Sequence, residues 1–249
     1  MSSKINISHI LRLSEQSFKQ NIKPLLLFGA VFGVVIFSLS YLTMIINRRS
    51  AFILIYPFLL GVIYAKFAVL IHRCVLLKET SYKNIFKWRS EEVLFMLAIF
   101  GVVILLMFLS WILLTLLMIL GDFGGGKQST LSGTSKVILF GVYMIGAVIA
   151  SRLALIFPSL AIGNRVNMNA IWNKTKNHKW MLFFLIIVFP MVTSILLDFI
   201  PGFGFLMVFV SGIITLLVVM FEVIILSHCY SEIIWQPRED HNPTEGIEV

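Results

Sequence analysis

Long apolar runs dominate the chain, and its polar positions gather between them. A helix needs about 20 mainly apolar residues to span the hydrocarbon core of a bilayer. Strands of a membrane barrel would instead alternate apolar and polar residues over about ten positions. Six uninterrupted runs reach the helical length, at residues 24–46, 51–77, 93–120, 137–163, 180–200 and 205–228. The pattern therefore predicts an all-α fold, a polytopic transmembrane bundle of six spans.

The two ends of the chain have a different character from the runs. Residues 6–22 place Ile7, Leu11, Phe18 and Ile22 on one side of a helix, with charged and polar residues elsewhere. This is the pattern of an amphipathic helix lying in a membrane interface. The last residues have prolines and acidic side chains but no apolar period, as in disordered segments. We therefore expect three parts: a cytoplasmic amphipathic segment at 1–23, a transmembrane domain at 24–230 and a disordered cytoplasmic tail at 231–249.

The composition excludes a water-soluble globule. Of 249 residues, 59% are apolar and only 13% are charged, against about 45–50% and 25% in soluble domains. Because a soluble domain must cover its surface with polar atoms, the excess apolar side chains have to face lipid.

The cations are distributed unevenly between the two sets of loops. The amino-terminal segment, the second and fourth connections and the tail together hold 14 Lys and Arg residues, and the opposite connections hold 4. Short loops rich in Lys and Arg stay in the cytoplasm. Both termini are therefore predicted to be cytoplasmic. The net charge of +8 accordingly indicates anionic lipid at that face, as a partner alongside the bilayer itself, and not nucleic acid.

Three charged residues lie within the runs at a similar depth. Lys66, Arg152 and Glu222 are 15, 15 and 17 residues from the predicted outer ends of their spans, or roughly 22 to 26 Å at about 1.5 Å per residue. In one interpretation they form an intramembrane cluster in which Glu222 pairs with Arg152, Lys66 or both, because an unpaired charge in hydrocarbon is costly. In the other, both cations extend to the cytoplasmic interface and Glu222 hydrogen-bonds locally or is neutral.

Two further features interrupt or begin the spans. Pro158 and Pro190 fall inside the fourth and fifth runs, where each removes a helical hydrogen bond and is expected to kink its helix. Glu91 and Glu92 precede the third run and resemble the paired glutamates of intramembrane proteases of the prenyl-protein processing family. Those proteases place an arginine one turn later, which this chain lacks. The pair is better explained by the positive end of a helix dipole.

The sequence holds no recognisable catalytic or metal-binding motif. It contains no nucleophile elbow, and its five histidines have no zinc-ligand spacing. The two cysteines, Cys74 and Cys229, are too few for a disulfide framework. We therefore assign no catalytic, cofactor-binding or metal-ligating residue.

Two stretches resemble the YciC-like inner-membrane proteins, a family related to the membrane domain of certain glycerophosphodiester phosphodiesterases. The first, residues 61–88, is a span that runs into a short basic loop. The second, residues 152–180, places Arg152 before Pro158 and continues into a short basic helix ending at Trp180. The resemblance covers roughly residues 50 to 190. It implies a six-helix bundle of a bacterial inner membrane and carries no catalytic residues.

These observations favour a non-enzymatic inner-membrane protein with a structural or accessory role in the cell envelope. Its basic helix carries Lys174, Lys176 and Lys179 between two tryptophans, which suits an interface with anionic lipid. The alternative is a small transporter or channel that uses Lys66, Arg152 and Glu222. An intramembrane hydrolase is the weakest hypothesis, since its chemistry is missing.

The orientation can be tested with alkaline phosphatase fusions, which are active only outside the cytoplasm. Fusions after Arg49 and Gly125 should be active and fusions after Lys83 and Lys176 inactive, because the cation-rich connections stay inside. Activity of the fusion at Lys83 would overturn the assigned orientation.

Overall fold

The computed structural model describes residues 5–45, 52–80, 87–122, 133–164, 167–198 and 204–235, and all of their regular structure is helical. Six segments of these residues are long and apolar enough to cross a membrane, so the predicted all-α bundle with six spans is confirmed. The α-helices are α1 Ile7–Gln20, α2 Ile22–Ile45, α3 Phe52–Leu76, α4 Ser90–Asp122, α5 Gly133–Leu153, α6 Ile156–Ala161, α7 Met168–Thr175, α8 Lys179–Phe183, α9 Phe189–Asp198 and α10 Gly204–Ile233.

Two predicted spans differ from the expectation, the sixth in where it ends and the fifth in how its helix is built. α10 continues to Ile233, so residues 231–233 belong to the last helix and not to the expected tail. Residues 236–249 of that tail lie outside the described residues. The fifth span is a composite of α7, a 3-10 turn, α8, a π-helical segment and α9. Apolar composition predicts that a segment crosses the membrane, and it does not predict these changes of helical winding.

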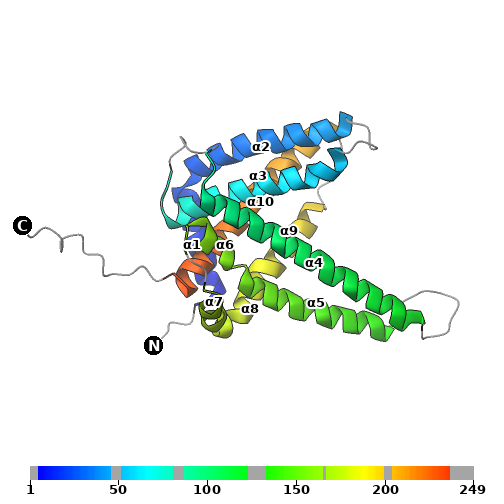
Figure 1. Cartoon of the computed structure of the whole chain (residues 1–249). Coiled ribbons are helices and arrows are strands. Elements are labelled where there is room, and N and C mark those ends of the chain that lie inside the picture. The colour runs from blue at the N-terminus through cyan, green and yellow to red at the C-terminus, as the bar shows by residue number, and fades with distance from the viewer. Residues whose placement is uncertain are drawn as a thin grey trace, which may run out of the picture.

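α3 is the central helix of the bundle. It packs against α2, α4, α6 and α10, as the side-by-side ribbons of α2, α3 and α10 in Figure 1 illustrate. Phe28 of α2, Phe67 of α3 and Met220 of α10 are buried together in one apolar cluster. A Cβ at Gly29 would overlap Cε of Met220, so the glycine allows this methionine to reach α2.

Other parts of the long helices are exposed to their surroundings. The described side chains between residues 101 and 112 of α4 are exposed on every side of the helix. They include Met107 and Trp111, which are 68% and 64% exposed. A helix that is apolar all round is suited to lipid. Of the described residues in these helices, therefore, the close-packed ones lie toward one end of the bundle.

The amphipathic segment forms the expected helix, α1, and it packs on α10. Ile10 and Ser14 of α1 are completely buried, and the ring of Phe18 meets that of Phe221 edge to face at 6.3 Å. Pro24 cannot donate a helical hydrogen bond, and the chain turns at Asn21, whose side chain bonds the carbonyl of Ser17 at 3.0 Å. The apolar side of α1 is therefore covered by protein, and its opposite side is left to the surroundings.

Both predicted proline sites coincide with breaks in helical winding. The fourth span stops at Leu153 and resumes at Ile156. Pro158 has no N–H for the carbonyl of Ala154, which accepts from Phe157 at 3.1 Å instead. The π-helical segment Phe184–Val188 ends two residues before Pro190, which is the second residue of α9. Pro57, which the sequence analysis did not single out, lies inside α3.

The packing of α1 on α10 predicts a stability difference between two isoleucines. Replacing Ile10, which is fully buried, with Ala should lower the free energy of unfolding by about 2–5 kcal/mol, since the cavity stays lined by α10. Ile22→Ala removes the same atoms from a side chain that is 40% exposed and should change it by less than about 1 kcal/mol. Denaturant titration in mixed micelles measures both, and equal losses would contradict the docking of α1.

Candidate functional site: the charged end of the bundle

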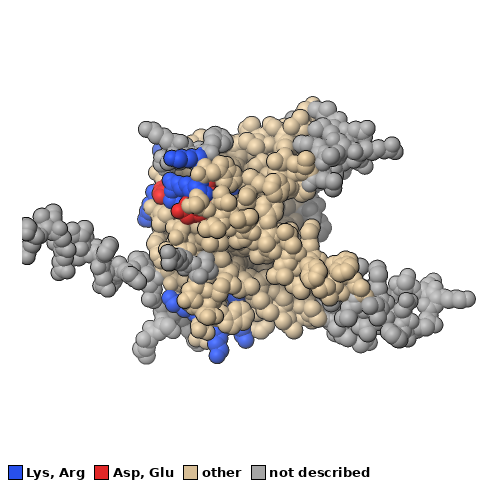
Figure 2. Space-filling view, in the orientation of Figure 1, with Lys and Arg blue, Asp and Glu red and all other residues tan. Residues whose placement is uncertain are grey.

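Apart from Glu222, the acidic and basic side chains that the structure describes gather at one end of the molecule. Figure 2 shows Lys, Arg, Asp and Glu confined to the end at which α1, α6 and α7 lie in Figure 1, whereas the rest of this face is uncharged. The predicted cation-rich connections bring their residues to this end. Its buried members form the candidate site.

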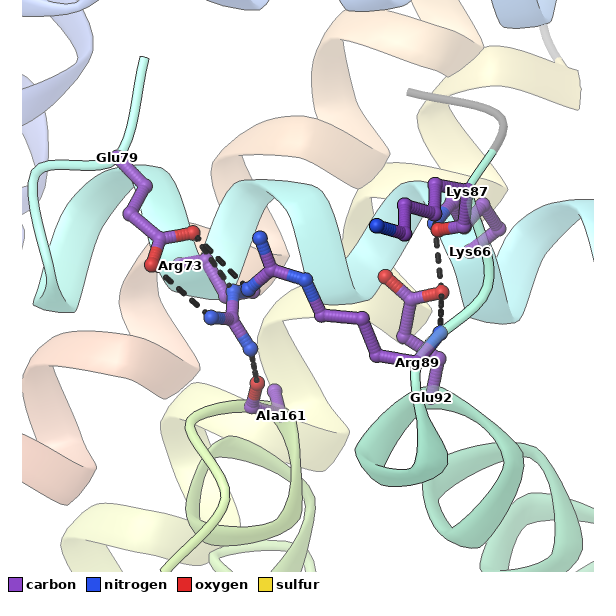
Figure 3. Close-up of polar contacts among 7 residues, drawn as sticks. All are labelled: Lys66, Arg73, Glu79, Lys87, Arg89, Glu92 and Ala161. Atoms are coloured by element: carbon purple, nitrogen blue, oxygen red, sulfur yellow. Dashed lines mark hydrogen bonds and ion pairs between the residues drawn. The ribbon is translucent and has the colours of Figure 1, made fainter. Parts of the chain in front are cut away.

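Lys66 of α3 has three partners. Its Nζ donates to Oε2 of Glu92 at 2.6 Å and to the carbonyl of Lys87 at 2.7 Å (Figure 3). It also lies 5.3 Å from the centre of the Trp88 ring. Both charged side chains are nearly inaccessible, at 5% and 4% exposure. In the interior such a pair needs further hydrogen bonds to offset desolvation, and the carbonyl supplies one.

Glu92 holds the start of α4 in two ways. The carboxylate that binds Lys66 also accepts the backbone N–H of Arg89 at 3.2 Å. This is the glutamate arm of a capping box, in which the third helical residue bonds the residue before the helix. Glu91 and Glu92 therefore lie in the first turn of α4 as predicted. The pairing of Glu92 with Lys66 was missed, because the sequence analysis compared charges within spans only.

A second ion pair lies about two turns further along α3 (Figure 3). Arg73 binds the carboxylate of Glu79 with Nε and one terminal nitrogen, both at 2.9 Å, and its other nitrogen donates to the carbonyl of Ala161 at the end of α6. Arg89 approaches the same carboxylate at 3.6 Å. Lys78 has a left-handed backbone, with φ of 56°, which turns Glu79 back toward Arg73. α3, α4 and α6 are thereby joined by one network.

Arg73 holds the pKa of the Glu79 carboxyl below its usual value, chiefly by hydrogen bonding it, against a smaller opposing effect of burial. A carboxylate with a lowered pKa stabilises the fold above its ordinary pKa, and this contribution is lost as the pH falls through the lowered value. The link between α3 and its following connection is therefore present at neutral pH.

Arg152, at the end of α5, is bound to α7. Its guanidinium stacks 3.4 Å from the centre of the Trp172 ring, donates to the Trp172 carbonyl and donates to Oγ1 of Thr175 at 2.9 Å. The Thr175 hydroxyl in turn donates to the carbonyl of Ile171 at 2.8 Å. Arg152 is 7% exposed and Thr175 is fully buried. This cation thus fixes the helix α7 against α5, without a carboxylate among the described residues.

The predicted basic helix is divided between three elements. Lys174 lies in the last turn of α7, Lys176 begins the 3-10 turn and Lys179 begins α8. All three lysines are exposed. Lys174 donates to the carbonyl of Ile234 at 3.0 Å, which ties α7 to the end of α10. Lys176 and Lys179 keep their charges at the surface, beside the exposed Trp172 and Trp180.

The predicted pairing of Glu222 with Arg152 or Lys66 is wrong. In the described part of the chain Glu222 takes part in no ion pair. Its Oε1 lies 3.1 Å from Oγ1 of Thr193 in α9, within hydrogen-bond distance. This is a local contact, as in the second interpretation. A shared depth in the bilayer leaves open the direction in which each side chain points around its helix. Lys66, Arg152 and Glu222 accordingly belong to three separate contacts.

Two serine–histidine pairs join α10 to its neighbours, and sequence spacing could not indicate them. Nδ1 of His72 lies 2.7 Å from Oγ of Ser227, and Ser227 donates to the carbonyl of Val223 at 2.9 Å. Because a hydroxyl has one proton, His72 is the donor in this pair, and Ser227 is not activated as a nucleophile. Nε2 of His228 lies 2.7 Å from Oγ of Ser17, a second link between α1 and α10.

The described residues contain no group of His, Cys, Asp and Glu side chains placed to hold a metal ion. Comparison with protein-family models, with curated proteins and with solved structures finds no match to the chain.

The buried pair predicts a non-additive loss of stability. Glu92→Gln, which keeps the shape of the side chain, leaves the Lys66 charge uncompensated and should lower the free energy of unfolding by about 3–5 kcal/mol. Adding Lys66→Met should recover part of that loss, because no charge then stays buried. Glu91→Gln, one residue earlier in the same turn, should cost less than about 1 kcal/mol. Denaturation of the wild type, the two single variants Glu92→Gln and Lys66→Met, the double variant and Glu91→Gln in mixed micelles tests this. Simple additivity of the substitutions at 66 and 92 would contradict the pair.

Proposed function

We propose that this multi-span membrane protein is a non-enzymatic component of a bacterial inner membrane with a structural or accessory role in the envelope. The observation that carries the proposal is the use of the buried cations. Lys66, Arg73 and Arg152 each hold two or more helices or connections together through their contacts. In a transporter with a charged translocation path, by contrast, these cations would have to face the solute and could not all be engaged in contacts between helices. The resemblance to YciC-like proteins supports the same assignment.

The charged end is proposed to face the cytoplasm. Its exposed cations come from α1, from the connection after α3 and from α7 and α8, the segments that the cation distribution assigns to the inside. An inner leaflet rich in anionic lipid attracts such cations by about 1 kcal/mol for each Lys or Arg near the surface.

The lipid-facing group at this end is proposed to be Lys176 and Lys179 with the rings of Trp172 and Trp180. Tryptophan favours the level of the lipid headgroups, and the two exposed rings flank the lysines along the chain. The stacked Arg152 and the bond from Lys174 to the Ile234 carbonyl attach this segment to α5 and to the end of α10. A fixed pair of cations with aromatic neighbours is suited to binding an anionic headgroup.

The alternative is a small transporter, for which the intact contact between Glu222 and Thr193 beside Pro190 is the remaining support. π-helical segments such as Phe184–Val188 frequently occur at functional sites. Ion flux in liposomes separates the two functions. An accessory protein gives no flux above protein-free vesicles, and a transporter gives flux that Glu222→Gln changes.

Lipid titration of single lysine variants tests the proposed headgroup contact. Lys176→Gln should weaken phosphatidylglycerol binding about fivefold, since one surface cation contributes about 1 kcal/mol. Lys19→Gln is the control, because it removes the same charge from the same end, where Glu15 already pairs with it, and should change binding less than about twofold. Native mass spectrometry of the purified protein measures both.

Equal effects of the two variants would show a response to net charge alone and would contradict a headgroup contact at α7 and α8. Phosphatidylcholine, which carries no net charge, should bind the wild type and both variants alike.

A further inference from the structure

Glu222 is an acidic residue placed among apolar helix faces. From Trp180 to Leu197 no residue can titrate, and none can from Gly204 to Phe221. Met220 and Ile224 are buried against α2 and α3. A helical residue two positions away from each of them projects to the other side of α10, where α9 lies.

The contact of Glu222 on that side is a hydroxyl, and that hydroxyl has two acceptors. Oγ1 of Thr193 lies 3.1 Å from Oε1 of Glu222 and 2.9 Å from the carbonyl of Pro190. A threonine hydroxyl has a single proton to donate, and an ionised carboxylate can only accept. If Glu222 were ionised, one of the two acceptors would have no proton from Thr193. If Glu222 is protonated, it donates to Thr193 and Thr193 donates to Pro190, so both contacts become hydrogen bonds.

Among the residues that the structure describes, the elements packed around this site place no cation in an ion pair with Glu222. The π-helical segment and α9 contribute apolar side chains up to Leu197 and the hydroxyls of Thr193 and Ser194. From α1, Phe18 reaches this level and packs on Phe221, whereas the described charged residues of α1, Arg12, Glu15 and Lys19, are exposed. On α10 itself, His228 is paired with Ser17.

The cations that depth suggested as partners are also engaged elsewhere. Lys66 forms its ion pair with Glu92. Arg152 is hydrogen-bonded to Thr175 in α7. An uncompensated carboxylate at membrane depth is costly, and a polar membrane group without a charge partner is accommodated better when it is neutral.

We infer that Glu222 is a proton-binding site that stays protonated at neutral pH. Its carboxyl group donates to the hydroxyl of Thr193, and that hydroxyl donates to the carbonyl of Pro190. The site joins α10 to α9 at the place where α9 follows the π-helical segment. The occupancy of the proton therefore determines whether Thr193 donates to the carbonyl of Pro190 or to Glu222. This role is independent of the proposed accessory function and of its lipid contact.

Infrared difference spectra of the reconstituted full-length protein test the inference. A glutamic acid with an ordinary pKa of about 4.3 is protonated in only about one molecule in 500 at pH 7. Subtracting the Glu222→Gln spectrum from the wild-type spectrum at pH 7 should therefore reveal the C=O band of a protonated carboxyl, at the intensity of about one group per chain. Glu15→Gln is the matched control, because Glu15 is exposed and paired with Lys19, and its difference spectrum should show only carboxylate bands.

Loss of carboxylate bands in Glu222→Gln, as in the control, would overturn the inference. A second measurement addresses the link to α9. Thr193→Val removes the acceptor of the carboxyl proton and should shift the C=O band of Glu222 to higher frequency, as expected for a carboxyl that loses its hydrogen bond. Thr193→Ser, which keeps the hydroxyl, should leave the band in place. An unchanged band in Thr193→Val would show that the proton is not donated to Thr193.

Discussion

The ion pair between Lys66 and Glu92 is the contact on which the charged end of the bundle depends. Lys66 lies on α3, the helix in contact with α2, α4, α6 and α10, and its ammonium is nearly inaccessible. Without the carboxylate it would be an isolated buried charge, which is strongly unfavourable. The same carboxylate fixes the start of α4 by accepting the N–H of Arg89. The Glu92 side chain therefore both neutralises the buried charge of Lys66 in α3 and sets where α4 begins.

The end of α6 is positioned by neighbouring residues of α3 and α4, namely Arg73 and Glu91. α6 ends in a Schellman turn, in which Asn164 and Gly163 donate to the carbonyls of Ser159 and Leu160 at 3.0 Å each. Gly163 has a φ of 76°, and a Cβ there would lie 3.2 Å from Cγ of Glu91. The end of α6 thus fits against the first turn of α4, and Arg73 donates to its Ala161 carbonyl. A larger residue at Gly163 would be opposed by both the backbone and this close approach.

Polar contacts have this importance because lipid removes the usual driving force for packing. Apolar side chains gain little by leaving lipid for a neighbouring helix, and the described side chains of α4 between residues 101 and 112 are exposed on every side. Helix partners are chosen by small residues, aromatic fits and hydrogen bonds. Gly29 against Met220, Arg152 on Trp172 and His72 with Ser227 are such contacts. They lie at or near the charged end, where the described helices pack most closely.

The sequence by itself determined the class of fold, the number of apolar spans, the amphipathic α1 and the helix start at Glu91 and Glu92, because each follows from local composition, periodicity or helix-end chemistry. It also identified Pro158 and Pro190, since proline always lacks the helical donor. It could not assign partners. Depth along a span can be counted from residue numbers, but the direction of a side chain around its helix relative to a neighbour depends on packing. The tertiary structure therefore decided that Lys66 binds Glu92, that Arg152 binds α7, and that Glu222 faces Thr193.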